Sequence, residues 1–114
     1  MSNGKNVQPN EIEFKLEKYD DYVKEAAVVQ DGDKLCAIIV PQKDWAAALT
    51  DDEAAAQLKR EVVEPYNMTV SAYKKIMSVL VYRGDLPRTK LDKLQRFKLK
   101  EILKNEQGAR SKQH

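Results

Sequence analysis

The sequence predicts a small α+β sandwich in which a three-stranded sheet is covered by helices. Two apolar runs separated by Asp-Gly-Asp predict a pair of strands, and a later run rich in β-branched residues predicts a third. Apolar residues at helical spacing before, between and after these runs predict the covering helices. The chain has 114 residues, enough for one compact domain with its own core.

The segment "EIEFKLEKYDDYV" predicts a short amphipathic helix that begins near Asn10. Ile12, Leu16 and Tyr19 recur at the spacing of one helix face, whereas Phe14 lies off that line. The side chain of Asn10 is suited to cap the first turn. This helix should therefore pack on the sheet through its Ile12 face.

The first two strands are predicted to form a hairpin around residues 31–33. The second strand, residues 35–40, is apolar without alternation, so we expect both its faces to be covered. Pro41 should end it, because proline has no N–H for the ladder. Cys36 lies within this run and is interpreted as a small buried apolar residue.

A second helix is predicted from the pair Thr50 and Glu53, which fits a capping box, and "AAAQLKREVV" continues it. Pro65 should stop or restart this helix. We expect "NMTVSAYKKI" to add one or two helical turns, and "MSVLVYR" to be the third strand.

The last helix is predicted over residues 94–104. It should bury Phe97 and either Ile102 or Leu103 while its lysines stay in water. Residues 105–114 carry none of the large apolar side chains that pack a core, and we expect them to be a disordered tail.

The net charge is only +2, but it is unevenly distributed. From Arg83 onward there are ten Lys and Arg against four Asp and Glu, so the first 82 residues are net acidic. Such asymmetry indicates an anionic partner near the C-terminus or, more commonly, a solvated helix face. The single cysteine excludes an internal disulfide and suits a reducing compartment. With no long apolar run and no signal-peptide pattern, we expect a cytoplasmic protein without a transmembrane segment.

The stretch "LPRTKLDKLQRFKLK", residues 86–100, interleaves basic and apolar residues. Its proline favours an extended start, and "KLDK" then makes a turn that places Lys93 at or just before the last helix, with Asp92 as N-cap. A lysine at a helix N-terminus suits a phosphate, a carboxylate or a transition state that gathers negative charge. The pattern alone leaves three interpretations open: a solvated lysine, a nucleic-acid contact, or a catalytic loop. The acidic first two-thirds and the lack of interleaved aromatics disfavour nucleic acid.

This stretch resembles the closing motif of the adenylate-forming enzymes, which include acyl-CoA synthetases, adenylation domains and luciferases. That motif runs Pro, a basic or small residue, Thr, two variable residues, usually Gly-Lys, an aliphatic residue, a variable one and Arg. Here it falls on Pro87, Thr89, Lys93, Leu94 and Arg96. One departure is Asp92, which stands at the usual glycine position.

The start of the chain resembles the same family. "GKNVQPNEIE" is similar to the segment just beyond the family's interdomain hinge, with its glycine at Gly4 and its Glu-Ile-Glu at residues 11–13. "VKEAAVV", "AIIVP" and "SAYKKI" follow in the family's order. The resemblance covers residues 2–104 and looks closest to bacterial long-chain fatty-acid–CoA ligases.

The resemblance implies that residues 1–104 are the mobile C-terminal domain of an AMP-forming acyl-CoA ligase. Its substrates would be a carboxylic acid, expected to be a fatty acid, ATP with Mg2+, and coenzyme A. Its partner would be the N-terminal ATP- and acyl-binding domain of the same protein, which we expect to be absent from this chain. The full-length enzyme would be cytoplasmic or, through that domain, peripheral to the membrane, and the isolated fragment is expected to be inactive.

The family also implies roles for three residues. Lys93 would be the catalytic residue of acyl-adenylate formation, and Gly4 would line the coenzyme A channel. Arg96 would contact a phosphate or pair with a nearby acid. Glu11 and Glu13 are interpreted as structural, because two residues two positions apart on a helix do not face one substrate. No cluster of His or Cys favours a metal.

The alternative interpretation is a stand-alone binding module that uses the basic C-terminal face on nucleic acid or an acidic partner. A steep dependence of binding on salt concentration would favour this alternative.

Overall fold

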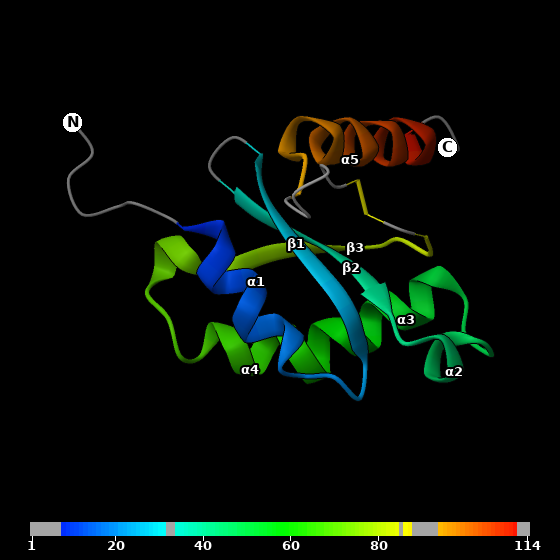
Figure 1. Cartoon of the computed structure of the whole chain (residues 1–114), viewed down its shortest axis with the longest axis horizontal. Helices are drawn as coiled ribbons and strands as arrows, with labels where there is room; N and C mark the ends of the chain where they lie inside the picture. The colour runs from blue at the N-terminus through cyan, green and yellow to red at the C-terminus, as the bar shows by residue number, and fades with distance from the viewer. Residues whose placement is uncertain (1–7, 32–33, 85, 88–93, 112–114) are drawn as a thin grey trace.

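The computed structural model describes residues 8–31, 34–84, 86–87 and 94–111 (Figure 1). Three strands form one sheet in the order β1-β2-β3, with β1 antiparallel to β2 and β2 parallel to β3. The elements run in the order α1 (Pro9–Glu17), β1 (Val23–Asp31), β2 (Lys34–Pro41), α2 (Lys43–Ala46), α3 (Asp51–Leu58), η1 (Lys59–Val63), α4 (Glu64–Asn67), η2 (Ala72–Lys74), β3 (Ile76–Val81) and α5 (Arg96–Ser111). The predicted α+β class and three-stranded sheet are confirmed.

Helices cover both faces of the sheet. Along β1, Ala26 and Val28 belong to the core cluster on the α1, α3 and α4 side, whereas Ala27 and Val29 belong to the cluster beneath α5. This alternation follows from the two-residue period of a strand. Figure 1 shows α5 on one side of the sheet and the other helices on the opposite side. The central strand β2 is buried from its second residue to its last, as its apolar run predicted.

Helix α1 packs on the sheet through the predicted face. Ile12 and Leu16 are buried, whereas Phe14 is 64% exposed. The predicted cap at Asn10 is wrong: the helix begins at Pro9, and Gln8 precedes it without a side-chain cap. Proline suits the first helical position, because its fixed φ is already helical and its missing N–H would have no partner there.

The predicted capping box is confirmed at the start of α3. The backbone N–H of Glu53 donates to Thr50 Oγ1 over 3.1 Å, and the N–H of Thr50 donates to Glu53 Oε1 over 2.9 Å. Of the two alternatives predicted for Pro65, a stop is wrong and a restart is confirmed: α4 begins at Glu64 with Pro65 in its first turn and continues to Asn67. One π-helical turn, η1, comes just before it, and the N–H of Glu64 donates to the carbonyl of Lys59. The wider turn shifts the hydrogen-bond pattern, so the chain passes Pro65 without a break.

The segment between α4 and β3 holds one helical turn, the 3-10 turn η2, as the lower of the two predicted numbers of turns. Side chains of α4 hold it in place. The Tyr66 hydroxyl donates to the carbonyl of Lys74 over 2.9 Å, and burial raises the pKa of that hydroxyl. The Asn67 amide bonds both the N–H and the carbonyl of Ile76.

Of the residues predicted to anchor α5, Leu103 is confirmed as buried and Phe97 is not. Leu99 and Leu103 are buried and Ile102 is half-buried, but Phe97 is 63% exposed, so the prediction for Phe97 is wrong. Leu99 and Leu103 are four positions apart and share one face, whereas Phe97 is two positions from Leu99 and points away from it.

The helix also extends further than predicted. It continues to Ser111, beyond the expected start of a disordered tail at Asn105. The lack of large apolar side chains predicted no packing, but a helix that is already anchored adds a backbone hydrogen bond for each residue it gains.

Candidate functional site

The described residues on either side of the motif around Lys93 form a short structure that we call the stem: Leu86 and Pro87 after β3, and residues 94–95 before α5. The N–H of Tyr82 donates to the carbonyl of Ile39 over 2.9 Å and so extends the pairing of β3 with β2. Leu86 is 4% exposed and packs in the core cluster beneath α5. The N–H of Gln95 then donates to the carbonyl of Pro87 over 2.9 Å. This bond holds Pro87 next to Gln95 at the base of α5.

Of the three predicted site residues, the structure describes the backbone of Arg96. Gly4 and Lys93 lie outside the described residues, and Arg96 is the first residue of α5. Because α5 begins at Arg96, Gln95 and not Asp92 precedes the first turn, so the predicted N-cap is wrong. Lys93 is three positions upstream of the helix.

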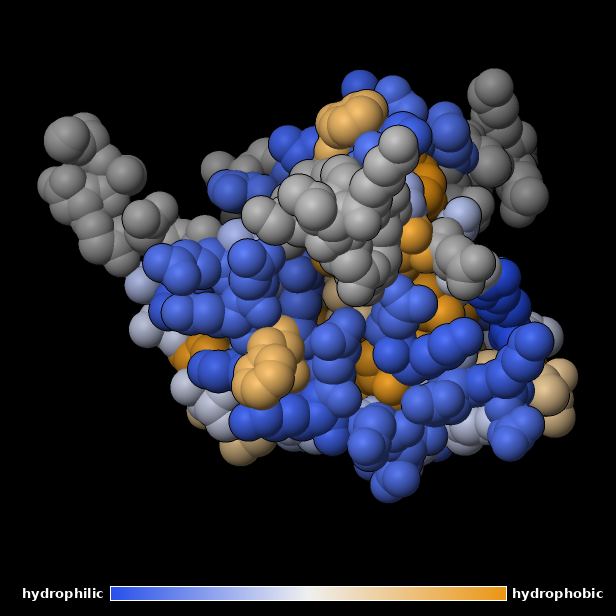
Figure 2. All heavy atoms as spheres, viewed as in Figure 1, coloured by the Kyte–Doolittle hydropathy of each residue, from blue (hydrophilic) through white to orange (hydrophobic). Residues whose placement is uncertain are grey.

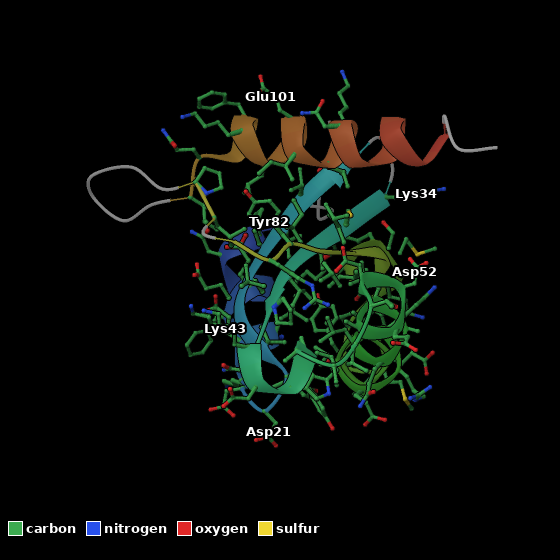
Figure 3. All side chains as sticks on the ribbon, turned by 90° about the vertical axis from the view of Figure 1, so that its right-hand side faces the viewer. Asp21, Lys34, Lys43, Asp52, Tyr82 and Glu101 are labelled. Atoms are coloured by element: carbon green, nitrogen blue, oxygen red, sulfur yellow. The ribbon has the colours of Figure 1, made fainter. Side chains whose placement is uncertain are left out.

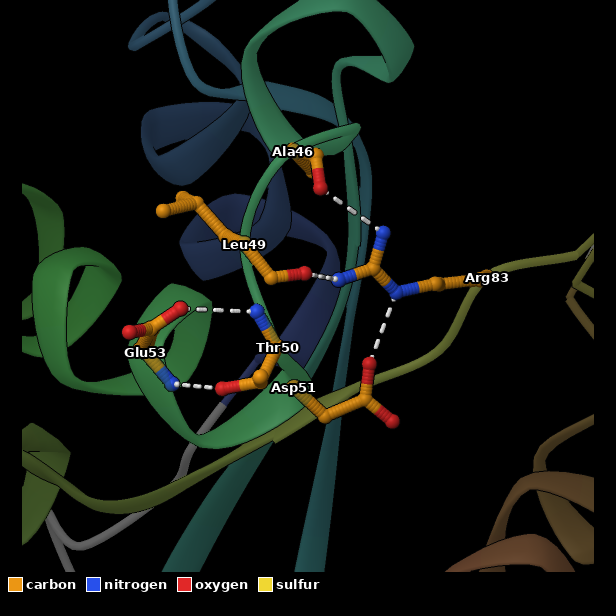
Figure 4. Close-up of polar contacts among 6 residues, drawn as sticks. All are labelled: Ala46, Leu49, Thr50, Asp51, Glu53 and Arg83. Carbon is orange, nitrogen blue, oxygen red and sulfur yellow. Dashed lines mark hydrogen bonds and ion pairs between the residues drawn. The ribbon is translucent and has the colours of Figure 1, made fainter.

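Arg83 joins the exit of β3 to the connection between α2 and α3 (Figure 4). Its Nε donates to Asp51 Oδ1 over 2.7 Å, its Nη1 to the carbonyl of Ala46 over 3.0 Å, and its Nη2 to the carbonyl of Leu49 over 2.7 Å. A planar guanidinium can make three such bonds at once, which an ammonium group cannot do in this geometry. The stem is therefore held from the side of α2 as well as from α5.

The sequence pattern places Arg83 at the end of the predicted third strand and does not predict this role. Its partners are 32 to 37 positions away in the chain, so no local spacing in the sequence predicts them. The only sequence signal is an arginine between the end of a strand and a glycine.

The glutamates of α1 face the outer edge of β1. The N–H of Val28 donates to Glu13 Oε2 over 2.7 Å, and the N–H of Ala26 donates to Glu17 Oε2 over 3.1 Å. Glu13 is 7% exposed, whereas Glu11 is exposed in the first turn. The structural interpretation of Glu13 is therefore confirmed: its carboxylate accepts from an edge strand whose N–H groups have no neighbouring strand on that side.

A shallow hollow of about 260 Å³ lies beside the stem, between Tyr82, Pro87 and the outer side of α5. Helix α5 contributes Lys98 and Glu101 to it. Figure 3 shows Tyr82 beneath α5 and Glu101 on the helix above it. Opposite charges side by side give this hollow no preference for either sign of ligand.

The part of the chain that the structure describes holds neither a cluster of metal ligands nor a membrane-spanning helix. There, His, Cys, Asp and Glu side chains nowhere gather in threes as a metal site would need. None of the helices described is both long and apolar enough to span a membrane.

The mixed three-stranded sheet with its helices matches part of several solved chains. A benzoate CoA ligase from Burkholderia xenovorans LB400 is 32% identical, with a TM-score of 0.61 over 84% of this chain. ATP-bound MatB from Rhodopseudomonas palustris is 25% identical, with a TM-score of 0.55 over 85%. A fatty acyl CoA synthetase from Mycobacterium tuberculosis shares the fold, with a TM-score of 0.62 over 89% at 24% identity.

The chain belongs to the AMP-binding enzyme C-terminal domain family, whose profile matches residues 1–106. It spans 19% of the benzoate CoA ligase and 18% of each of the other two chains. None of the curated proteins matches it.

Proposed function

We propose that this chain is the mobile C-terminal lobe of an AMP-forming acid–thiol ligase. In the full-length enzyme it delivers Lys93 for the first half-reaction, in which a carboxylic acid and ATP form an acyl-adenylate and pyrophosphate. It then turns to present its other face for the second half-reaction, in which the thiol of coenzyme A takes the acyl group.

The observation that carries this proposal is the family match over residues 1–106, which includes the whole motif around Lys93. The stem supports it. Leu86 is buried and Pro87 is bonded to Gln95, so the segment between them starts and ends on rigid structure. A reacting group carried on such a base needs less ordering when it meets its substrate.

The chemistry of the first half-reaction requires a cation. A carboxylate and the α-phosphate of ATP repel each other, and negative charge grows on the phosphoryl oxygens as they react. A lysine carries a compact charge at the end of a flexible side chain, and this charge can lie between the two anions. ATP would bring its Mg2+ with it, and the ATP-bound MatB structure supports ATP as the substrate.

For the second half-reaction we assign Gly4 to the channel of the coenzyme A arm. A glycine lets the backbone approach a ligand without a Cβ in the way. We assign Arg96 to a phosphate contact in the first half-reaction. An Arg96→Ala enzyme that keeps its rate of adenylate formation would leave Arg96 with a structural role only.

The acid substrate is proposed to be a fatty acid. The solved relatives include a benzoate CoA ligase as well as a fatty acyl CoA synthetase, so the acid must be tested directly. Pyrophosphate release with dodecanoate, hexadecanoate and benzoate would decide it. A preference for benzoate would overturn the fatty acid and leave the reaction class intact.

The test of the proposed function is Lys93→Ala in the full-length enzyme. We expect adenylate formation, measured by pyrophosphate exchange, to fall by about three orders of magnitude, as losses of a positioned charge donor do. Acyl transfer from preformed adenylate to coenzyme A should stay within about twofold of wild type, because Lys93 acts only in the first half-reaction.

Lys90→Ala is the matched control, since it removes a lysine from the same segment outside the motif position. It should leave both half-reactions near wild type. Equal loss of both half-reactions in Lys93→Ala would contradict the proposed division of labour.

A further inference from the structure

A second hollow, which we call the corner hollow, lies where β3 leads into the stem. It has a volume of about 330 Å³ and opens between the start of β1, the end of β2 and α2. Val40, Pro41 and Ala46 form an apolar floor, and Lys24, Lys43 and Arg83 bring positive charge to its rim. Figure 2 shows apolar atoms recessed between hydrophilic ones around the end of β2.

Lys24 reaches this rim because of an irregularity in β1. Val23 pairs with Pro41 and Glu25 with Val40, so Lys24 is the extra residue of a β-bulge. Bulges redirect a side chain that a regular strand would place elsewhere, and they are frequent beside functional sites. The bulge thus adds a lysine to the hollow at the cost of one ladder position.

Lys24 and Lys43 differ from Arg83 in whether their charged groups have bonding partners. The Arg83 guanidinium is bonded to Asp51 Oδ1 over 2.7 Å and to two carbonyls. Lys24 and Lys43 are both exposed, and within residues 8–31, 34–84, 86–87 and 94–111 neither ammonium forms an ion pair or hydrogen bond. Figure 3 shows Lys43 at the corner of the molecule formed by α2. The hollow therefore offers two free cations above an apolar floor.

The shape and charge of this hollow suit an acidic side chain of a protein partner. A volume of about 330 Å³ accommodates one or two side chains, with a carboxylate between the ammonium groups and an aliphatic stem on the floor. The relatives are more than four times as long as this chain, so most of such an enzyme lies outside it. The hollow also adjoins Arg83 and Gly84, directly upstream of the stem.

The same face carries exposed apolar groups. In Figure 2 one such group lies over α1 and another over α5, and Phe14 and Phe97 are the exposed large apolar residues of these helices, 64% and 63% exposed. Exposed aromatic side chains are enriched where one protein meets another.

We propose that the corner hollow is a docking point for an acidic side chain of the large lobe, engaged when this domain is oriented for adenylate formation. This inference rests on the proposed function, because it assumes a large lobe that this domain approaches in two orientations. Lys24 and Lys43 are positioning residues: they hold the domain and do not touch the reacting atoms.

The test is the double variant Lys24→Glu with Lys43→Glu in the full-length enzyme. We expect adenylate formation to slow by about tenfold, because like charges replace complementary ones at the docking point. Acyl transfer from preformed adenylate should stay within about twofold. Raising the salt from about 50 to 500 mM should slow adenylate formation in wild type but not in the variant, since salt screens charge pairs at a surface.

Lys34→Glu with Lys75→Glu is the matched control. It makes the same change in charge at the opposite end of the sheet, where β2 and β3 begin and Leu35 pairs with Ile76. Lys24→Gln with Lys43→Gln is a milder variant in case the charge reversal disturbs folding, and a loss of about threefold is expected from it.

The inference fails if both lysine variants leave adenylate formation unchanged, if both half-reactions fall together, or if the control pair has the same effect. It also fails if this 114-residue chain binds pyrophosphate or ADP through Lys24 and Lys43, because the hollow would then be a ligand site. In each of these cases a selective loss in Lys93→Ala would leave the proposed function standing. If Lys93→Ala instead spares adenylate formation, the proposed function fails.

Discussion

Glu13 shows how a single residue can belong to one element and serve another. It lies in α1, yet its carboxylate accepts the N–H of Val28 in β1 over 2.7 Å, and it is 7% exposed. Hydrogen bonds to a charged group contribute about 1.5–3 kcal/mol, more than neutral ones. Glu13 of the Glu-Ile-Glu triplet thus fixes the helix on the edge of the sheet.

We therefore predict that Glu13→Ala lowers the free energy of unfolding by about 2 kcal/mol. Glu13→Gln keeps an acceptor and should cost about half as much. Glu11→Ala is the matched control: it removes an exposed glutamate from the same triplet and should cost about 0.5 kcal/mol. Urea unfolding of the three variants gives the comparison, and equal losses at the two positions would refute the strand-edge role.

At the scale of elements, α5 illustrates how the register of a helix decides which residues are core. Leu99 is fully buried and Leu103 nearly so, and both pack with Leu86 of the stem. Phe97, the largest apolar side chain of the helix, points into solvent. The helix that holds the stem in place is thus anchored by leucines and not by its aromatic residue.

Truncation of the two side chains should separate these roles. Leu99→Ala should lower the free energy of unfolding by about 3 kcal/mol, because it leaves a cavity in a closed cluster. Phe97→Ala should change it by about 0.5 kcal/mol or less. Thermal or urea unfolding of the 114-residue chain measures both. A larger loss for Phe97→Ala would mean that the helix packs through a different face.

At the scale of the whole molecule, the two core clusters lie on opposite faces of one sheet. Trp45 packs against the cluster on the α1 side, and Cys36 is buried in the cluster beneath α5. Because β2 contributes to both clusters, loss of either should remove support from the other.

We predict that this chain folds as one unit and yet has no ligase activity. Trp45 fluorescence and the rate of Cys36 labelling probe opposite faces of the sheet. If the chain unfolds as one cooperative unit, both should report the same midpoint in urea. ATP-dependent thioester formation should be absent, because the ATP and acyl pockets are proposed to lie in the large lobe. Separate midpoints would contradict the single unit, and thioester formation by the chain alone would contradict the proposed division of the enzyme.

The sequence by itself determined the class of fold, the strands, the capping box and the buried face of α1. These features depend on local spacing: apolar runs, a turn signal, and residues three or four positions apart that share a helix face. The motif around Lys93 is likewise contiguous, so its likeness to the family can be recognised from the order of its residues alone. Its place in space was not predictable, and the first turn of α5 proved to begin after Gln95.

Only the tertiary structure decided the face of α5, the passage of the helix through Pro65, the clamp made by Arg83 and the corner hollow. Each depends on residues brought together from distant parts of the chain, such as Arg83 with Ala46, Leu49 and Asp51. Even the β-bulge at Lys24 can be recognised only from the pairing of β1 with β2. Local patterns specify elements because their interactions are between near neighbours, whereas a surface or a stem exists only once the packed sheet has set which elements meet.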